Sequence, residues 1–273
     1  MSAPPSQPGD VQEAEPHGDA VARVAGERSE QERASPGIAA LRLLNDEVVA
    51  CRRCDRLVTW REQTAVDKRA AFADEDYWGR GVPGFGDPAA AVVLVGLAPA
   101  AHGANRTGRM FTGDRSGDFL YAALHRCGFA NQPTSVRAGD GLALRDAYIT
   151  AAVRCAPPAN KPTTAERDTC RPFLERELAL LVNARIAVAL GAFAYGVLCT
   201  IGGVRPRPRF GHGAIAEVPA ADGSAEPAPL GGISRIICSF HPSQQNTFTG
   251  RLTADMADTV LLDARRLANL PPG

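Results

Sequence analysis

Three polar segments carry the residues with the clearest catalytic potential, and each one follows an apolar run. The first is GLAPAAHGANRTGRMFTGD (residues 96–114), in which His102, Phe111 and Asp114 stand among glycines that let a ligand approach the backbone. A phenylalanine between arginines is suited to stack on a planar ring and to place the Asp114 carboxylate beside it. The glycines alone would equally suit a tight connection between a strand and a helix.

The second and third segments add amide, hydroxyl and imidazole groups. RCAPPANKPT (residues 154–163) contributes Asn160 and Lys161, and its prolines and threonines also suit a rigid turn that leads into a helix. HPSQQNTFTGRLT (residues 241–253) begins with His241 directly after an apolar run. The side chains that follow His241 are suited to phosphate contacts, and they are Ser243, Gln244, Asn246 and Arg251.

Four of the seven cysteines have the spacing of a thiolate site. Cys51 and Cys54 form a C-x-x-C pair among charged residues, where an apolar filler has no use, and Cys155 and Cys170 lie on two later segments. Four thiolates could hold zinc or an iron-sulfur cluster, and the spacing does not choose between them. The other three cysteines stand inside apolar runs and are expected to be buried fillers: Cys127, Cys199 and Cys238.

The elements that must position these segments alternate between strand and helix. The strand-like runs are residues 91–95, 147–153, 185–190 and 234–240, with a shorter one at 214–218. Helical patterns cover residues 38–50, 116–127, 164–182, 192–201 and 252–267. This alternation predicts an α/β fold with a mainly parallel sheet. Ligands of such sheets bind at the carboxyl ends of the strands, so the three polar segments should converge there.

Composition bounds the class of protein. The chain has 273 residues, 45% of them hydrophobic, and 30 basic against 30 acidic side chains, so net charge alone indicates no nucleic-acid partner. Residues 1–37 are rich in Pro, Ser, Gly and Glu and are expected to be disordered, which leaves a single domain over 38–273. No apolar run is long enough to cross a bilayer, and an odd cysteine count without a signal-peptide pattern predicts a cytoplasmic protein.

Taken together, the three motifs and the four cysteines resemble a family 5 uracil-DNA glycosylase over about residues 41–267. The resemblance implies a three-layer α/β/α sandwich, a 4Fe-4S cluster on Cys51, Cys54, Cys155 and Cys170, and excision of uracil and other deaminated bases from DNA. Related family 4 enzymes have an acidic residue where this chain has Leu97, and an Asn that reads uracil where it has Ala151. Those departures imply a looser substrate range that includes hypoxanthine.

The charges that develop when an N-glycosidic bond breaks suggest a role for each candidate residue. The target nucleotide is flipped out of the duplex, its base stacks on Phe111, and His241 donates a hydrogen bond to the base oxygen as negative charge develops there. Asp114 orients or activates water, a role that Asn160 could also fill. Backbone amides of Gly96 and Ala98 are expected to contact the base carbonyl, and residues 244–251 are expected to wedge or clamp the DNA strand. The cluster would be structural, and the enzyme is expected to be a monomer.

Two other classes of protein remain compatible with the residues. One is a redox protein whose cluster carries electrons and whose loops bind a nucleotide cofactor. The other is a zinc-stiffened DNA-binding module without catalysis, which the neutral net charge neither supports nor excludes. Activity on a uracil-containing duplex separates the enzyme from both.

Overall fold

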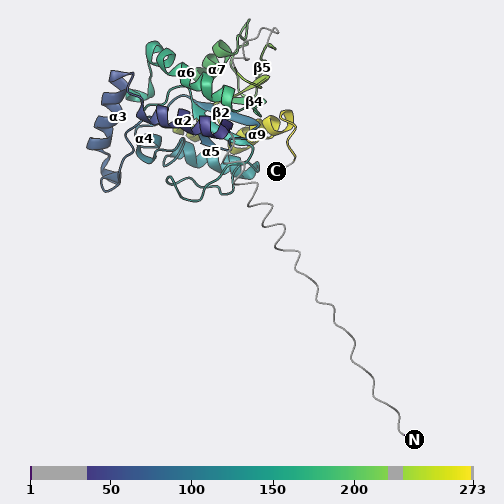
Figure 1. Cartoon of the computed structure of the whole chain (residues 1–273), viewed down its shortest axis with the longest axis horizontal. Helices are drawn as coiled ribbons and strands as arrows, with labels where there is room; N and C mark the ends of the chain where they lie inside the picture. Colours follow the sequence, from purple (N-terminus) through teal and green to yellow (C-terminus); the bar gives the residue numbers. More distant parts are fainter. Residues whose placement is uncertain (2–35, 221–229, 272–273) are drawn as a thin grey trace.

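A six-stranded sheet forms the centre of the computed structural model, which describes Met1 and residues 36–220 and 230–271 (Figure 1). The strand order is β1-β3-β2-β4-β6-β5, with four parallel inner strands and an antiparallel strand at each edge. The strands are β1 (Phe85–Gly86), β2 (Val92–Gly96), β3 (Ala147–Ala151), β4 (Ile186–Leu190), β5 (Ile215–Glu217) and β6 (Arg235–Ser239). The predicted mainly parallel α/β sheet is therefore confirmed.

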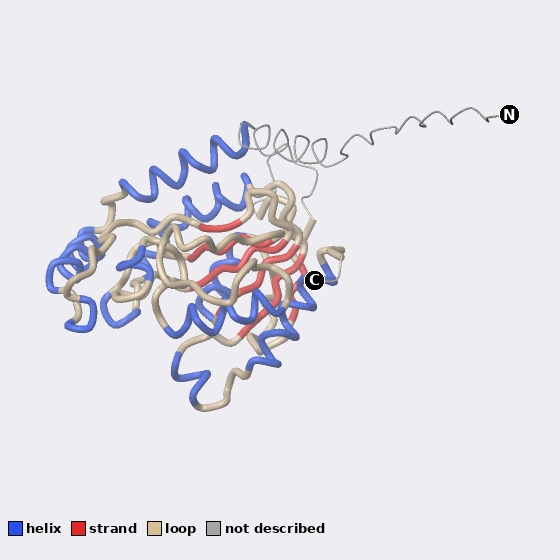
Figure 2. The backbone as a smooth tube through the Cα atoms, turned by 90° about the horizontal axis from the view of Figure 1, so that it is seen from below, coloured by secondary structure: helices blue, strands red, loops and turns tan. Residues whose placement is uncertain are grey.

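Helices cover both faces of the sheet (Figure 2). The side chains on each face of the inner strands are mainly apolar, so both faces must be buried. Val93 and Val95 of β2 face a layer made of α2 (Pro36–Ala50), α6 (Thr164–Leu180) and α7 (Ala192–Ile201). Val92 and Leu94 face the opposite layer, made of α5 (Arg115–Arg126) and α9 (Ala254–Leu267). Each layer of helices buries its own apolar cluster against one face of the sheet. The loops lie at the carboxyl edge of the strands.

The predicted elements match the structure within two residues at most ends, whereas one long helix and several short elements were not expected. These are α3 (Asp55–Asp67), α4 (Ala104–Thr107), α8 (Gln244–Phe248), the edge strand β1, and two single 3₁₀ turns at Ala70–Phe72 and Pro158–Asn160. Apart from α3, these elements are one or two turns or one residue pair long, which is too short to show a hydrophobic period. α3 has 13 residues, but only two of its apolar side chains, Leu57 and Val58, are buried. The predicted disorder of residues 1–37 falls outside the described residues, apart from Met1 and the start of α2 at Pro36.

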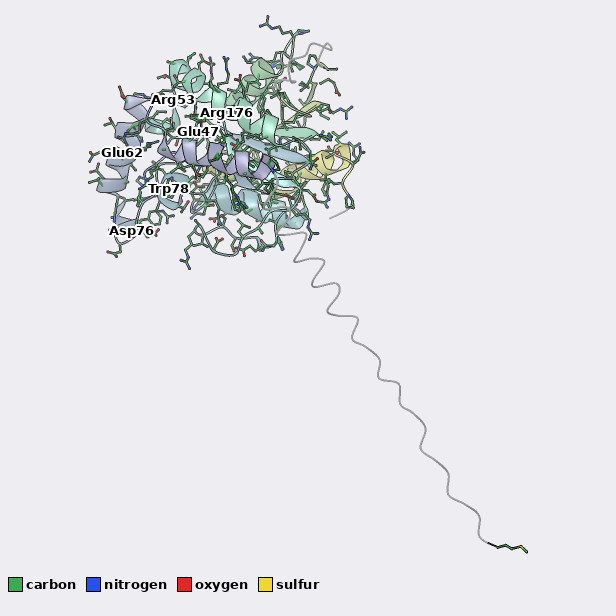
Figure 3. The ribbon with its side chains drawn as sticks, viewed as in Figure 1. Glu47, Arg53, Glu62, Asp76, Trp78 and Arg176 are labelled. Carbon is green, nitrogen blue, oxygen red and sulfur yellow. The ribbon has the colours of Figure 1, made fainter. Side chains whose placement is uncertain are left out.

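Ion pairs attach α6 to its neighbours. Arg176 of α6 pairs with Glu47 of α2 on the surface, at 2.6 Å (Figure 3). Beneath them the fully buried Glu177 accepts hydrogen bonds from Thr150 of β3, at 2.6 Å, and from Arg154, which follows that strand. A buried carboxylate without such partners would be strongly destabilising, so α6 holds the carboxyl end of β3 in place.

Within the described part of the chain, no helix is both long enough and apolar enough to cross a membrane.

Candidate active site

The segment after β2 folds back onto its own strand. Phe111 has a left-handed backbone, with φ of 51°. A Cβ atom at Gly96 would lie 2.9 Å from the Phe111 ring, and one at Gly117 would lie 1.8 Å from the Phe111 carbonyl oxygen. Only glycine leaves room at these two positions. The two glycines therefore allow Phe111 to pack against the end of the sheet and bring residues 112–114 to the carboxyl edge.

Asp114 caps the first turn of α5. One carboxylate oxygen accepts a 2.9 Å hydrogen bond from the Gly117 amide. The other lies over Gly103, where a Cβ atom would be only 2.0 Å from it. Burial raises the pKa of Asp114, and this effect is opposed by the amides of Gly117 and Ser116 and by the charge of Arg106. A carboxyl group with a perturbed pKa in a cleft is typical of catalytic acids and bases.

Arg106 of α4 stabilises the loop that carries Asp114 through hydrogen bonds to its backbone. Its buried guanidinium donates to the carbonyl oxygens of His102, at 2.9 Å, and Gly113, at 2.7 Å, and it forms an ion pair with Glu75. The Phe72 ring covers the guanidinium, with 3.9 Å between the Arg106 Cζ atom and the ring centroid. The peptide that precedes Asp114 is thereby fixed, since a guanidinium with several acceptors has a defined orientation.

A second buried arginine fixes the other side of the loop. Arg109 pairs with Asp140 at 2.7 Å and donates to Thr112 at 2.9 Å and to Ser135 at 2.9 Å. The Arg109 guanidinium holds the pKa of Asp140 well below its usual range. The loop around residues 135–140, which sequence reasoning did not select, therefore supports the segment that carries Asp114.

Asn160 reaches the same edge from the loop after β3. The loop contains the predicted turn, at Pro158–Asn160, and leads into α6 with Thr163 as the helix cap, whereas the predicted role of Asn160 stays a prediction. Thr163 and Glu166 form a reciprocal capping box at the start of that helix. Ala159 and Asn160 have left-handed backbones, with φ of 52° and 55°. Such backbone conformations cost energy in residues other than glycine and are concentrated at functional sites.

His241 lies two residues after the end of β6, and its ring lies beside that of Phe111. The ring centroids are 5.9 Å apart with an interplanar angle of 35°. Asn246 of α8 donates to the His241 carbonyl oxygen at 2.9 Å, and Ser243 caps α8 by accepting from the Asn246 amide at 3.4 Å. The imidazole is only partly accessible to solvent. Burial lowers its pKa to about 4, so the ring is neutral at physiological pH.

A single cleft of about 970 Å³ brings most of the predicted site residues together. Asp114, Asn160 and His241 all line it, as do three further predicted residues: Ala98, Ser243 and Gln244. Gly96 and Phe111 are not among the lining residues, since they pack against each other behind the loop.

The remaining predicted residues lie outside the cleft lining. Ala151 is buried within β3, where it pairs with Gly96. Asn246 is bonded to the backbone of His241, and the Arg251 guanidinium lies 4.7 Å from the centroid of the Phe240 ring. Their predicted contacts with base or DNA therefore stay predictions.

Sequence reasoning missed one wall of the cleft. Arg69, Phe72 and Glu75 line it from the segment that follows α3. This segment has no strand before it and no recognisable motif, so only the folded chain reveals its position. Its backbone docks on α4, because the amides of Trp78 and Gly79 donate to the carbonyl oxygens of Arg106 and Asn105.

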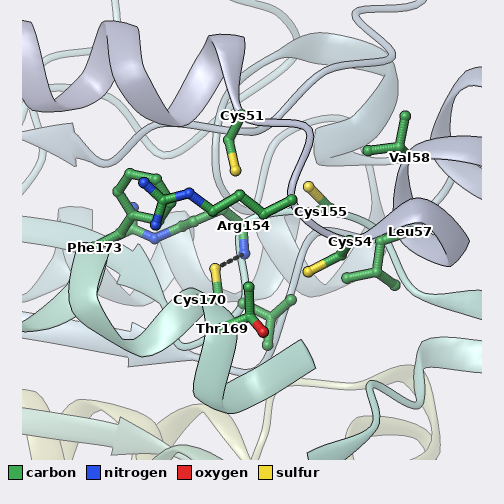
Figure 4. Close-up of a pocket in the computed structure, with 11 residues that line it drawn as sticks. Cys51, Cys54, Leu57, Val58, Arg154, Cys155, Thr169, Cys170 and Phe173 are labelled. Carbon is green, nitrogen blue, oxygen red and sulfur yellow. Dashed lines mark hydrogen bonds between the residues drawn. The ribbon is translucent and has the colours of Figure 1, made fainter. Parts of the chain in front are cut away.

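The four predicted cysteines line one small cavity, together with side chains of α3, of the loop after β3 and of α6 (Figure 4). Arg61 donates to the Cys155 sulfur at 2.8 Å and the Arg154 amide donates to the Cys170 sulfur at 3.3 Å. Burial raises the pKa of Cys170 to about 12. Among the residues that the structure describes, no group of three or more His, Cys, Asp or Glu is arranged to hold a single metal ion. The other three cysteines are buried, as predicted.

The chain is similar to known DNA repair proteins. A family model described as "Uracil DNA glycosylase superfamily" matches residues 83–265. A type-5 uracil-DNA glycosylase of Mycobacterium tuberculosis is 54% identical over 230 residues, which are 83% of this chain and 81% of that protein. A type-5 uracil-DNA glycosylase of Thermus thermophilus is 50% identical over 224 residues, 82% of this chain and 96% of that protein. A type-4 uracil-DNA glycosylase of Pyrobaculum aerophilum is 36% identical over 125 residues, 45% of this chain and 56% of that protein.

We expect the His241 imidazole to titrate at about pH 4 rather than at its ordinary value of 6.5, because burial disfavours the charged ring. Between these two values the unfolded chain takes up a proton that the folded chain does not. Stability should therefore fall as the pH drops from about 6.5 to about 4. The measurement is the pH dependence of the imidazole NMR signals, assigned with His241→Asn. A midpoint near 6.5 would show that the ring is solvated.

Proposed function

The chain belongs to the uracil-DNA glycosylase superfamily as a type-5 uracil-DNA glycosylase, a hydrolase of N-glycosidic bonds, and we propose that it removes uracil and further deaminated bases from DNA through His241 and Asp114. The observation that carries this proposal is the convergence of Asp114, Asn160 and His241 on one cleft from three strands of the sheet. An abasic site and a free base are the products.

Cleavage of the N-glycosidic bond builds negative charge on the departing base and positive charge on the sugar. A neutral imidazole carries one N–H group, which His241 can donate to the base oxygen without first binding a proton. The low pKa of His241 supports this role, because the donor is present in the same form across the physiological pH range. Preorganised donors of this kind are commonly the largest contribution to catalysis.

Asp114 is the group proposed to orient or activate the attacking water. Its capping bond to Gly117 occupies one carboxylate oxygen, and the oxygen over Gly103 is directed at the side of the cleft that Gly103 lines. Its negative charge would also oppose the positive charge that develops on the sugar. Asn160 lines the same cleft and is the alternative ligand for this water. Phe111 packs beside His241 outside the cleft lining, so the predicted stacking of the flipped base on its ring is not part of this proposal.

The proposed breadth of substrate rests on the two departures from the family 4 pattern. Ala151 is buried in β3 beside Gly96 and has no amide with which to read a base edge. Leu97 lines the cleft with an apolar side chain in place of an acid. A site that lacks a dedicated hydrogen-bonding pair discriminates weakly between related ligands. Hypoxanthine is therefore proposed as a second substrate base beside uracil.

We propose that Cys51, Cys54, Cys155 and Cys170 hold a 4Fe-4S cluster. Four thiolates are the usual ligand set of such clusters, and all four side chains line one cavity. The buried Arg61 supplies a positive charge and a hydrogen bond to Cys155, as an anionic cluster requires. The cluster, when bound, would crosslink the start of α3, the β3 loop and α6. This role is structural because the hydrolysis transfers no electrons.

The test of function is incubation with a duplex that contains one uracil, followed by alkaline cleavage at abasic sites. The wild-type protein should excise the uracil, so that alkali then cuts that strand. Excision by His241→Ala should be slower by about a hundredfold or more, the typical cost of one oxyanion donor. His125→Ala is the control, because His125 is exposed in the last turn of α5, outside the cleft. Wild-type rates in His241→Ala would remove His241 from the mechanism. If alkali cuts no strand after incubation with the wild-type protein, the proposed glycosylase function is wrong.

Asp114→Asn separates the chemistry of Asp114 from its capping role. Asparagine caps a helix as well as aspartate does, so stability should be kept while the excision rate falls by about 10² to 10⁴. Asp114→Ala should lose the rate and also about 1 kcal/mol of stability. Thr253→Ala, which removes the cap of α9 away from the cleft, should cost similar stability and leave the rate unchanged. An active Asp114→Asn would favour Asn160 as the water ligand.

Cys51→Ser should lower the iron content and the melting temperature together, because metal binding contributes to folding. Metal analysis and the visible absorption of the purified protein measure the first effect, and thermal unfolding measures the second. Cys127→Ala is the matched control, since Cys127 is buried far from the cavity lining and should keep its iron. A colourless wild-type protein with one zinc per chain would overturn the cluster.

A further inference from the structure

The proposed mechanism leaves one wall of the cleft without a role. Arg69, Phe72, Glu75, His102 and Arg106 line this part of the cleft, which we call the outer wall. The cleft volume of about 970 Å³ is at the upper limit for sites that enclose a whole small ligand, so one base does not account for it. Asp76 and Trp78 in Figure 3 mark the segment that carries the wall, beside α4. The outer wall has room for another part of the substrate.

A chain of hydrogen bonds connects Arg69, Tyr77 and the ring of His102. The Arg69 amide donates to the Tyr77 hydroxyl oxygen at 3.3 Å, and that hydroxyl is 3.1 Å from Nδ1 of His102. With the hydroxyl as the donor in this pair, Nδ1 of His102 is the acceptor. A neutral imidazole whose Nδ1 accepts must carry its proton on Nε2. His102 therefore offers one fixed N–H donor in a residue that lines the cleft.

The charges around His102 favour an anion. Burial and the neighbouring charges of Arg69 and Arg106 lower the pKa of His102, so the ring is neutral and the positive potential there comes from the arginines. Arg106 is neutralised by Glu75. Arg69 is exposed and has no salt-bridge partner among the described residues. The two other carboxylates of the segment, Asp74 and Asp76, are not part of the cleft lining.

We propose that Arg69 and the Nε2–H of His102 form a subsite for a phosphodiester group of the strand that carries the damaged base. This inference rests on the proposed function, because a flipped nucleotide brings its flanking phosphates to the rim of the cleft. Arg69 attracts the phosphate through its positive charge. The neutral imidazole of His102 positions the phosphate through a directional hydrogen bond. The subsite holds the backbone of the strand while His241 and Asp114 act on the base and the sugar.

The subsite makes different predictions for its two residues. Losing one charged phosphate contact lowers the slope of log affinity against log salt by about 1, so Arg69→Met should bind DNA more weakly with a shallower slope. His102→Leu removes a neutral donor and should weaken binding about fivefold with the slope unchanged. His102→Gln, which can place an amide N–H near the position of Nε2, should restore much of the affinity. Arg69→Lys should restore the slope.

The experiment measures binding of the full-length protein to a duplex with a 2′-fluorinated deoxyuridine that resists cleavage, at several salt concentrations. Single-turnover excision of an ordinary uracil duplex at saturating protein is measured in parallel. Arg80→Met is the matched control, since Arg80 is an exposed arginine of the same segment that stacks on Trp78 outside the cleft. The expected result is a weaker affinity of Arg69→Met and His102→Leu relative to Arg80→Met, with single-turnover rates within about threefold of wild type.

Two outcomes would overturn the subsite. One is a salt slope of Arg69→Met equal to that of Arg80→Met. The other is a His102→Leu variant that binds like wild type and is slow at saturation, which would place His102 in the chemical step. Failure of the proposed function looks different, because then the wild-type protein binds the duplex without excising uracil.

Discussion

The contact between Phe111 and the backbone at Gly96 is the constraint on which the geometry of the active site depends. The segment after β2 must reverse over the end of its own strand, and the ring and carbonyl group of Phe111 fit only where Gly96 and Gly117 have no side chain. This reversal places Asp114 at the start of α5 and places the Phe111 ring beside His241. One close packing contact thus brings two segments together that are more than a hundred residues apart.

Buried arginines then keep that arrangement rigid. Arg106 and Arg109 lie on opposite sides of the Asp114 loop, and each is paired with a carboxylate and covered by an aromatic ring. Buried charges are costly unless they are paired, so these contacts have few alternative arrangements. These contacts hold the loop in one conformation, which is the kind of preorganisation that catalysis requires. The buried pair of Arg154 and Glu177 has the same effect on the loop that ends in Asn160.

The cysteine cavity and the cleft are separate but share supports. Arg61 contacts Cys155 through its side chain, and its carbonyl oxygen accepts a hydrogen bond from Asn105 of α4 at 3.2 Å. The same short helix carries Arg106, which holds the loop of Asp114. A structural cluster would thus stabilise the catalytic loop through α3 and α4 while it takes no part in the reaction. This connection links the residues before the sheet to the loop of Asp114.

The sequence by itself determined the parallel sheet and the residues at its carboxyl edge, because apolar periodicity and strand ends are local properties. Asp114, Asn160 and His241 were all selected on that basis, and all three line the cleft. Only the tertiary structure decided what depends on approach between distant segments. It placed the ring of Phe111 behind the cleft lining and added the outer wall with Arg69. It also engaged Asn246 with the backbone of His241. Contacts between loops that are distant in the sequence produce no periodic pattern of residue types. The positions of these residues therefore could not be predicted from the sequence.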